Sequence, residues 1–284
     1  MKNLIVRSIT GVLFVVIIVV ALMDAFATQV LFALVTGLAV WEYTGLVNNV
    51  KGVQVNRMIS TVAGVYFFLA VGGFCSGTVQ GGAVFVPYLL TVVYLFISEL
   101  YAGGENPVND MAYTMLGQMY IALPLSTINV LAFNATPDGA ITFNYLLPLS
   151  VFIFLWANDT GAYCTGSLIG KHKLFPRVSP GKTWEGSIGG AVVVLVAAAI
   201  IAWYDNETAV GEPCLNVYKW LGLGLVVVVF GTWGDLVESL FKRTLGIKDS
   251  GNILPGHGGM LDRFDSSLMA MPAAVLYIYS LSLF

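Results

Sequence analysis

Apolar residues run along this chain in long stretches that are separated by short polar segments. A membrane-spanning helix needs about 20 mostly apolar residues, and nine stretches approach that length. Gly and Pro inside them are tolerated because neighbouring helices of a bundle satisfy the backbone groups that they free. The pattern therefore predicts an all-α, polytopic integral membrane protein. The predicted spans are residues 4–23, 26–47, 58–75, 82–98, 111–133, 145–163, 187–204, 218–238 and 267–284.

The first apolar stretch also resembles a secretory signal peptide, with Ala25-Phe26-Ala27 in the place of a cleavage site. However, the stretch is long enough to span a bilayer, and many similar stretches follow it. A retained helix is the favoured interpretation.

Composition supports a lipid environment. Hydrophobic residues make up 57% of the chain and charged residues only 10%, whereas soluble domains carry about 25% charged residues. A chain this apolar cannot cover its own surface with polar groups in water. Three widely spaced cysteines form neither a disulfide framework nor a zinc pattern, and two histidines are too few for a His-rich metal site.

Basic residues orient the predicted spans, because cytoplasmic loops carry an excess of Lys and Arg. With the N-terminus in the cytoplasm, only Lys219 of the 13 basic residues faces the opposite side. We therefore expect a cytoplasmic N-terminus, N-terminal transmembrane helices over residues 1–140, and a C-terminal transmembrane region over residues 141–284. That region carries two cytoplasmic loops, at about 164–186 and 239–266.

The first polar cluster covers residues 156–190. Asp159 lies near the inner end of an apolar helix, where an ionised carboxylate is costly unless it is paired, so it is a candidate functional residue. The alternative is a structural ion pair. Several lysines and glycines follow it, and such residues suit a phosphate, because small residues let backbone N–H groups come close while ammonium groups neutralise charge. A basic loop that only sets topology is the competing interpretation.

Gly181-Lys182-Thr183 resembles the end of a nucleotide-binding P-loop, but it is not one. Pro176 stands where that motif requires its first glycine, and no strand is expected before it.

The second polar cluster covers residues 231–267. Asp235 and Glu238 are one helical turn apart and share a face, and Asp262 and Asp265 repeat that spacing before the last span. Helix capping is the alternative for one of these carboxylates. Oxygen ligands in this number suit Mg²⁺, and zinc is disfavoured. His257 would donate to a phosphate or to a carboxylate, and the sequence leaves both open.

The stretch SLFKRTLGIKDSGNILPGHGGMLDRFD resembles the signature of the phosphatidate cytidylyltransferases. The upstream segments SPGKTWEG and NDTGAY are also similar to that family, so the resemblance covers about residues 156–267. The signature matches at Ser239, Lys242, Arg243, Lys248, Asp249, His257, Gly258, Gly259, Asp262, Arg263 and Asp265.

This resemblance implies an enzyme that makes CDP-diacylglycerol and pyrophosphate from CTP and phosphatidate. It implies Mg²⁺ with a second cation such as K⁺, held by aspartates that match Asp235, Asp262 and Asp265, with Asp159 a weaker candidate. Glu185 and Asp249 are expected to orient the nucleotide or the groups that bind it. The remaining candidates for catalysis or for binding substrate phosphates are Lys171, Ser179, Thr183, Lys182, Lys242, Arg243, Lys248, His257 and Arg263.

The expected setting is the inner (plasma) membrane, with the active site facing the cytoplasm. The expected partners are CTP, phosphatidate and membrane lipids, together with a second copy of the chain in a homodimer. No nucleic-acid partner is expected.

Two other classes compete with this interpretation. A transporter or channel would also bury carboxylates such as Asp159 and Glu42, but the charge gathers at one membrane face and the halves show no convincing repeat. A CDP-alcohol phosphatidyltransferase would share the setting, but its different aspartate array is not found in the sequence.

Overall fold

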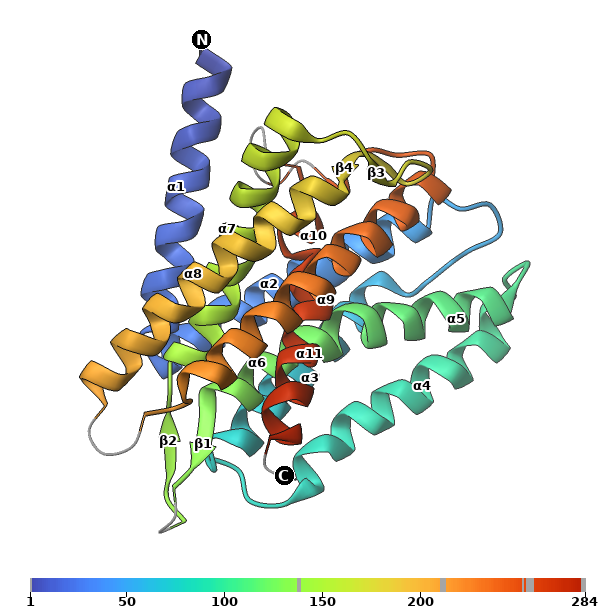
Figure 1. The fold of residues 1–284 in the computed structure, drawn as a ribbon. Helices are drawn as coiled ribbons and strands as arrows, with labels where there is room; N and C mark the ends of the chain where they lie inside the picture. Colours follow the sequence, from blue (N-terminus) through green and yellow to red (C-terminus); the bar gives the residue numbers. More distant parts are fainter. Residues whose placement is uncertain (1, 137–138, 210–212, 252, 254–257, 282–284) are drawn as a thin grey trace. The chain divides into compact units, whose positions relative to one another are not determined.

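A computed structural model of the protein describes residues 2–136, 139–209, 213–251, 253 and 258–281. The chain is predominantly helical and divides into two compact units, whose elements are labelled in Figure 1. Unit 1 comprises Met1–Tyr145 and Thr244–Phe264, and unit 2 comprises Leu146–Arg243 and Asp265–Phe284. The first break lies close to the predicted boundary at residue 140. The segment Thr244–Phe264, although it follows that boundary in sequence, belongs to unit 1.

In unit 1, the apolar helices α2 (Ala25–Val47) and α3 (Arg57–Cys75) begin at side-chain caps. Asp24 Oδ2 accepts a hydrogen bond of 2.8 Å from the N–H of Ala27 at the start of α2, and Asn56 caps α3 in the same way. The helical elements are α1 (Lys2–Leu22), α2 (Ala25–Val47), α3 (Arg57–Cys75), η1 (Gly82–Phe85), α4 (Val86–Ala102), α5 (Pro107–Gly117), η2 (Gln118–Ala122), α6 (Leu123–Ala132) and α10 (Leu261–Phe264).

The segments α5, η2 and α6 form one continuous helical stretch with a π turn at η2. Pro124 follows that turn and has no N–H to donate, so the regular backbone ladder is interrupted there. The buried side chain of Gln118 donates a hydrogen bond of 2.9 Å to the carbonyl of Ser60 on α3. This bond ties the π turn to the core of the unit.

Unit 2 contains α7 (Leu146–Ile169), α8 (Trp184–Thr208), α9 (Val217–Thr244) and α11 (Ser267–Ser280). Glycines allow α7 and α8 to pack closely. A Cβ atom at Gly161 would lie 3.0 Å from the Cα of Gly190, and a Cβ atom at Gly190 would lie 2.8 Å from the carbonyl oxygen of Asn158. This close packing positions the polar residues of α7 beside the start of α8.

Two short antiparallel hairpins were not predicted. β1 (Phe133–Ala135) pairs with β2 (Ile141–Phe143) in unit 1, and β3 (Lys173–Phe175) pairs with β4 (Ser179–Thr183) in unit 2. Their strands, three to five residues long, are too short to give an alternating pattern. The second hairpin lies in the predicted loop at 164–186 and leads directly into α8.

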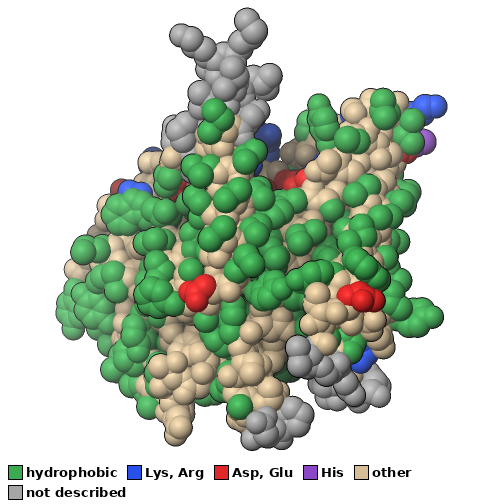
Figure 2. Space-filling model, turned by 90° about the vertical axis from the view of Figure 1, so that its left-hand side faces the viewer, with side chains coloured by type: hydrophobic (Ala, Val, Ile, Leu, Met, Phe, Trp, Pro, Cys, Tyr) green, Lys and Arg blue, Asp and Glu red, His purple; other side chains and the backbone are tan. Residues whose placement is uncertain are grey.

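Within the described residues, six helical stretches are long and apolar enough to cross a membrane. Hydrophobic side chains also cover much of the face in Figure 2. The prediction of an all-α membrane protein is therefore confirmed, while the count of nine spans and the cytoplasmic N-terminus stay predictions. The six stretches are Ala25–Val47, Arg57–Cys75, Gly82–Ala102, Pro107–Ala132, Trp184–Thr208 and Val217–Thr244.

Candidate active site

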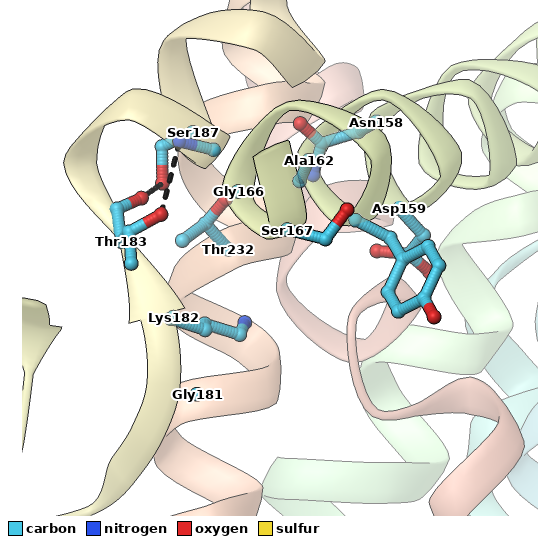
Figure 3. A pocket seen from close by; sticks show the side chains of 12 residues that line it. Asn158, Asp159, Ala162, Gly166, Ser167, Gly181, Lys182, Thr183, Ser187 and Thr232 are labelled. Atoms are coloured by element: carbon cyan, nitrogen blue, oxygen red, sulfur yellow. Dashed lines mark hydrogen bonds between the residues drawn. The ribbon is translucent and has the colours of Figure 1, made fainter. Parts of the chain in front are cut away.

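Unit 2 contains a cavity of about 420 Å³ bounded by α7, the turn from β4 into α8, and α9 (Figure 3). Small-molecule sites are typically about 300–1,000 Å³, so the cavity has room for part of a substrate. Most of the residues that line it are small or polar. The lining residues are Asn158, Asp159, Ala162, Tyr163, Gly166, Ser167, Gly181, Lys182, Thr183, Gly186, Ser187 and Thr232.

Lys182 links the β3–β4 hairpin to α9. Its Nζ lies 2.6 Å from Oδ2 of Asp235, and the two side chains are 26% and 29% exposed. Ser239, one turn further along α9, donates a hydrogen bond of 3.1 Å to the other carboxylate oxygen of Asp235. The structure thus brings together two residues that were predicted separately, one from each polar cluster; Lys182 lines the cavity, and both side chains are partly exposed.

Asp265 lies beside Asp235 in unit 2. A Cβ atom at Gly234 would lie 2.7 Å from the carbonyl oxygen of Asp265, so α9 contacts the backbone directly before α11. Burial and then the negative charge of Asp235 raise the pKa of Asp265. The Ser266 N–H, 2.6 Å from its Oδ1, opposes that rise, and Asp159 adds to it. The charges of Asp235 and Asp159 therefore both act on the carboxyl group of Asp265.

The position of Asp159 along its helix differs from the prediction. α7 continues to Ile169, beyond the predicted end at residue 163, so Asp159 does not lie near the end of its helix. Its side chain is exposed and lines the cavity. The cost expected for a carboxylate in an apolar helix is relieved because this face of α7 opens to the cavity.

Two predicted binding residues shape the turn that presents Lys182. The carboxylate of Glu185 accepts hydrogen bonds from the backbone N–H groups of Lys171, at 3.1 Å, and His172, at 3.2 Å, and it lies 2.5 Å from Nδ1 of His172. Thr183 caps α8, because its hydroxyl accepts a hydrogen bond of 3.1 Å from the third residue of that helix. Both side chains make contacts within the protein that hold the hairpin in place.

Lys242, predicted to bind phosphate, forms an ion pair with Glu238 one turn earlier on α9. The side chain of Glu238 is fully buried and that of Lys242 is 13% exposed. A buried carboxylate needs such a partner, so the pair has a structural function within α9. Lys242 also lowers the pKa of Asp265, in opposition to the larger effects of burial and Asp235.

The other predicted residues are distributed over both units. Those that lie on the surface with exposed side chains are Lys171, Arg243, Lys248, Asp249 and Arg263. Ser179 is half-buried and pairs with Phe175 in the hairpin. His257 lies outside the described residues.

Asp262 lies in unit 1, in a hydrogen-bonded network that the sequence did not predict. Its Oδ2 accepts from the backbone N–H of Ser250 at 2.8 Å, from the hydroxyl of Ser250 at 2.9 Å and from the N–H of Gly259 at 2.8 Å. Glu42 of α2 accepts from the same hydroxyl at 3.2 Å and from the N–H of Leu261 at 2.9 Å. The only sequence signal for Glu42 was a carboxylate inside an apolar stretch.

The acidic residues of unit 2 provide the hard oxygen donors that Mg²⁺ prefers. Burial and then the charge of Asp235 raise the pKa of Asp265, and a cation beside the two carboxylates would offset both effects, so these residues fit a divalent metal. As the described side chains stand, no three of the His, Cys, Asp and Glu types converge on one point. Asp262 belongs to the other unit, and the three-aspartate metal site stays a prediction.

Comparison with known proteins extends the similarity far beyond the polar clusters. The model of the cytidylyltransferase family matches residues 4–281. The chain is 33% identical over 264 residues to the phosphatidate cytidylyltransferase of Haemophilus influenzae, an alignment that covers 86% of this chain and 88% of the relative. Identity to the enzyme of the same name from Staphylococcus haemolyticus is 33% over 269 residues, covering 94% and 96% of the two chains. The corresponding Staphylococcus aureus protein is 32% identical over 268 residues, with the same coverage.

Proposed function

Because the chain belongs to the cytidylyltransferase family, we propose that the cavity of unit 2 and the acidic residues beside it form the active site of a phosphatidate cytidylyltransferase. The protein is a membrane-embedded enzyme that converts CTP and phosphatidate to CDP-diacylglycerol and pyrophosphate for phospholipid biosynthesis. We also propose which residues and cations take part in the reaction, and on which side of the membrane the site lies.

One observation supports this assignment above the others. The ammonium of Lys182 lies 2.6 Å from a carboxylate oxygen of Asp235 at a cavity that Asp159 also lines, and the charge of Asp235 acts on Asp265. Opposite charges gathered beside a cavity are what a site for a metal-bound polyphosphate requires. A purely structural ion pair would not need the cavity.

The chemistry asks little covalent work of the protein. A phosphate oxygen of phosphatidate forms a bond to the α-phosphorus of CTP, and the bond from that phosphorus to the oxygen of the leaving pyrophosphate breaks. Phosphatidate arrives ionised, so no general base is required. Both reactants are polyanions, and therefore positioning and charge neutralisation dominate the catalysis.

The basic residues have the task of neutralising that charge. In this proposal Lys182, Arg263, Arg243, Lys248 and Lys171 contact the phosphates of the two substrates. Lys182 is placed to exchange its contact with Asp235 for one with a phosphate, because both side chains are partly exposed. The remaining predicted binding residues are Ser179, Thr183, Glu185, Lys242, Asp249 and His257.

The metal is proposed to be Mg²⁺, with a second cation such as K⁺. Asp235, Asp262 and Asp265 would hold it, with Asp159 as a further candidate. When bound, the cation supplies charge neutralisation for the polyphosphate and the leaving pyrophosphate.

The setting follows from the lipid substrate. A two-chain lipid stays in the bilayer while CTP is soluble, so the site is proposed to lie where helices meet the headgroups on the cytoplasmic side of the inner (plasma) membrane. A homodimer is part of the same proposal.

Replacing Asp262 by Asn tests the metal assignment. Asn keeps an oxygen acceptor for the N–H groups of Ser250 and Gly259 but removes the charge that would hold the cation. We expect formation of labelled CDP-lipid from labelled CTP and phosphatidate to fall at least about 100-fold. Initial rates of the purified full chain in detergent, with Mg²⁺ or with a chelator, measure this.

Glu207→Gln is the matched control, because Glu207 is an exposed carboxylate at the end of α8. That variant should keep the wild-type rate. Full activity of Asp262→Asn, or of the wild-type protein in chelator, would remove the metal assignment.

A further inference from the structure

Glu42 is a buried carboxylate that the residues assigned so far do not explain. It lies in α2, inside one of the apolar stretches, and is 7% exposed. Among the described residues, no ion pair with a Lys, Arg or His side chain involves Glu42. A buried charge without a cation is costly unless hydrogen bonds compensate it, so its partners indicate why it is there.

Those partners all belong to the segment that carries the family signature. Glu42 Oε2 accepts from the hydroxyl of Ser250 at 3.2 Å and from the backbone N–H of Leu261 at 2.9 Å. The hydroxyl of Ser250 also donates to Asp262. A hydroxyl has one proton, so the two carboxylates share it, with the shorter contact, 2.9 Å, to Asp262. Ser250 therefore links Glu42 to Asp262, and Glu42 also holds the N–H of Leu261, the first residue of α10.

The signature glycines fit around these carboxylates. A Cβ atom at Gly259 would lie 2.4 Å from both carboxylate oxygens of Glu42, and one at Gly251 would lie 2.3 Å from Oε1. Gly258 has φ +82°, and a Cβ atom there would lie 2.5 Å from Asp262 Oδ2. Residues 250–251 and 258–261 therefore enclose the Glu42 carboxylate with backbone, and a side chain at these glycines would displace it.

Aromatic packing also holds the same short helix. The ring of Phe264 lies 5.7 Å from the ring of Phe14 and 6.0 Å from that of Phe32, in edge-to-face geometry. Phe32 and Glu42 are both on α2. This helix therefore contacts α10 at two points, one polar and one aromatic.

We propose that Glu42 is a positioning residue for the reaction: it anchors Ser250 and the start of α10, and thereby fixes the orientation of the Asp262 carboxylate. This inference rests on the proposed metal-binding role of Asp262. Replacing a residue that holds a metal ligand in place through hydrogen bonds typically lowers metal affinity or activity about 10–100-fold. The N-terminal helices thus have a part in the chemistry although the signature lies elsewhere in the sequence.

Glu42→Gln tests the inference in the purified full chain. The amide keeps the size of the side chain, but its NH₂ group replaces one of the two carboxylate oxygens. That group is a donor beside two other donors, the hydroxyl of Ser250 and the N–H of Leu261. We expect backbone amides of residues 250–264 to exchange hydrogen faster than in the wild type, without substrate or metal present. We also expect Mn²⁺, used as a paramagnetic probe, to bind about 10–100-fold more weakly, with a matching fall in kcat.

Two further variants keep the test decisive if Glu42→Gln folds poorly. Ser250→Ala removes only the shared hydroxyl and should show the same changes to a smaller extent, and its effect should be less than additive with that of Glu42→Gln. Glu99→Gln is the matched control, because Glu99 is another buried carboxylate of unit 1, 8% exposed. It should leave exchange over residues 250–264 and Mn²⁺ binding unchanged.

The outcomes separate the two proposals. Wild-type exchange over residues 250–264 in Glu42→Gln overturns the positioning role, whatever the activity. Faster exchange in that variant, together with full activity and Mn²⁺ affinity in Asp262→Asn, leaves the anchoring by Glu42 in place and removes Asp262 from the metal site.

Discussion

Lys182 extends from the hairpin to Asp235, and its ammonium group affects the electrostatic potential in the cavity that it lines. An ion pair that is about a quarter exposed contributes little to folding, on the order of 0–1 kcal/mol. Its electrostatic effect on a bound polyanion is larger, because a cavity excludes much of the screening water. In the proposed mechanism, the same contact therefore matters more for catalysis than for stability.

Lys182→Met should separate these two effects. Met keeps the length of the aliphatic side chain and removes the charge. We therefore expect kcat/KM for CTP to fall about 10²–10³-fold, while the free energy of unfolding changes by no more than about 1 kcal/mol. Initial rates at varied CTP and a melting curve measure the two quantities. Lys173→Met, on the exposed strand of the same hairpin, is the control and should retain activity. Equal losses in both variants would contradict a specific role of Lys182.

At the scale of elements, the contact between α9 and the segment before α11 decides where Asp235 and Asp265 lie. Gly231 and Gly234 form the contacting face of α9, and a Cβ atom at Gly234 would lie 3.0 Å from the carbonyl oxygen of Ser266 as well as 2.7 Å from that of Asp265. Backbone atoms cannot move aside as a flexible side chain can. The two aspartates are thus brought together by helix packing.

Gly234→Ala should push the two elements apart. Overpacking of this kind costs about 1–3 kcal/mol, which we expect as a lower melting temperature, accompanied by reduced CDP-lipid synthesis because Asp265 shifts relative to Asp235. Gly82→Ala is the control, since nothing lies within 4 Å of a Cβ atom there. An unchanged rate in Gly234→Ala would mean that the spacing of the two aspartates is not critical.

The sequence predicted most of the long helices because length and hydrophobicity are local properties. The predicted span 26–47 corresponds to α2 (Ala25–Val47), and 58–75 corresponds to α3. α7 extends to Ile169 through polar and small residues because it packs on α8, a tertiary contact that composition does not reveal. The hairpin β3–β4 was missed for a similar reason: the contacts of Glu185 hold it.

The candidate site was partly predictable for the same physical reason. Asp235, Asp265 and Lys182 are predicted as functional residues because charged residues are rare in so apolar a chain. The structure brings them together in unit 2. The contact between Glu42 and Ser250 joins residues 208 positions apart. Such a pair has no local pattern, so only the fold reveals it.

At the scale of the whole molecule, the signature segment passes through both units. Lys242 and Arg243 belong to unit 2, the chain enters unit 1 at Thr244, and it returns to unit 2 at Asp265. The predicted catalytic residues therefore lie in both units. One of the predicted metal ligands, Asp262, lies in unit 1 together with the N-terminal helices.

The predicted membrane orientation can be measured with an impermeant thiol reagent. A Lys173→Cys variant that lacks the three native cysteines should react in inside-out vesicles and not in sealed right-side-out ones. A second variant that keeps only Cys214, which is exposed and lies in a predicted outer loop, should give the reverse pattern. Labelling of both from the same side would refute the orientation derived from the basic residues.

The bond between Glu42 and Ser250 has a consequence for the biogenesis of the protein. The ribosome makes Ser250 208 residues after Glu42, which at about 5–20 residues per second is a delay of about 10–40 s. Throughout this interval α2 carries a carboxylate whose permanent partners do not yet exist, so other hydrogen-bond donors have to compensate it. The N-terminal bundle can therefore reach its final packing only near the end of translation, when the returning segment closes it.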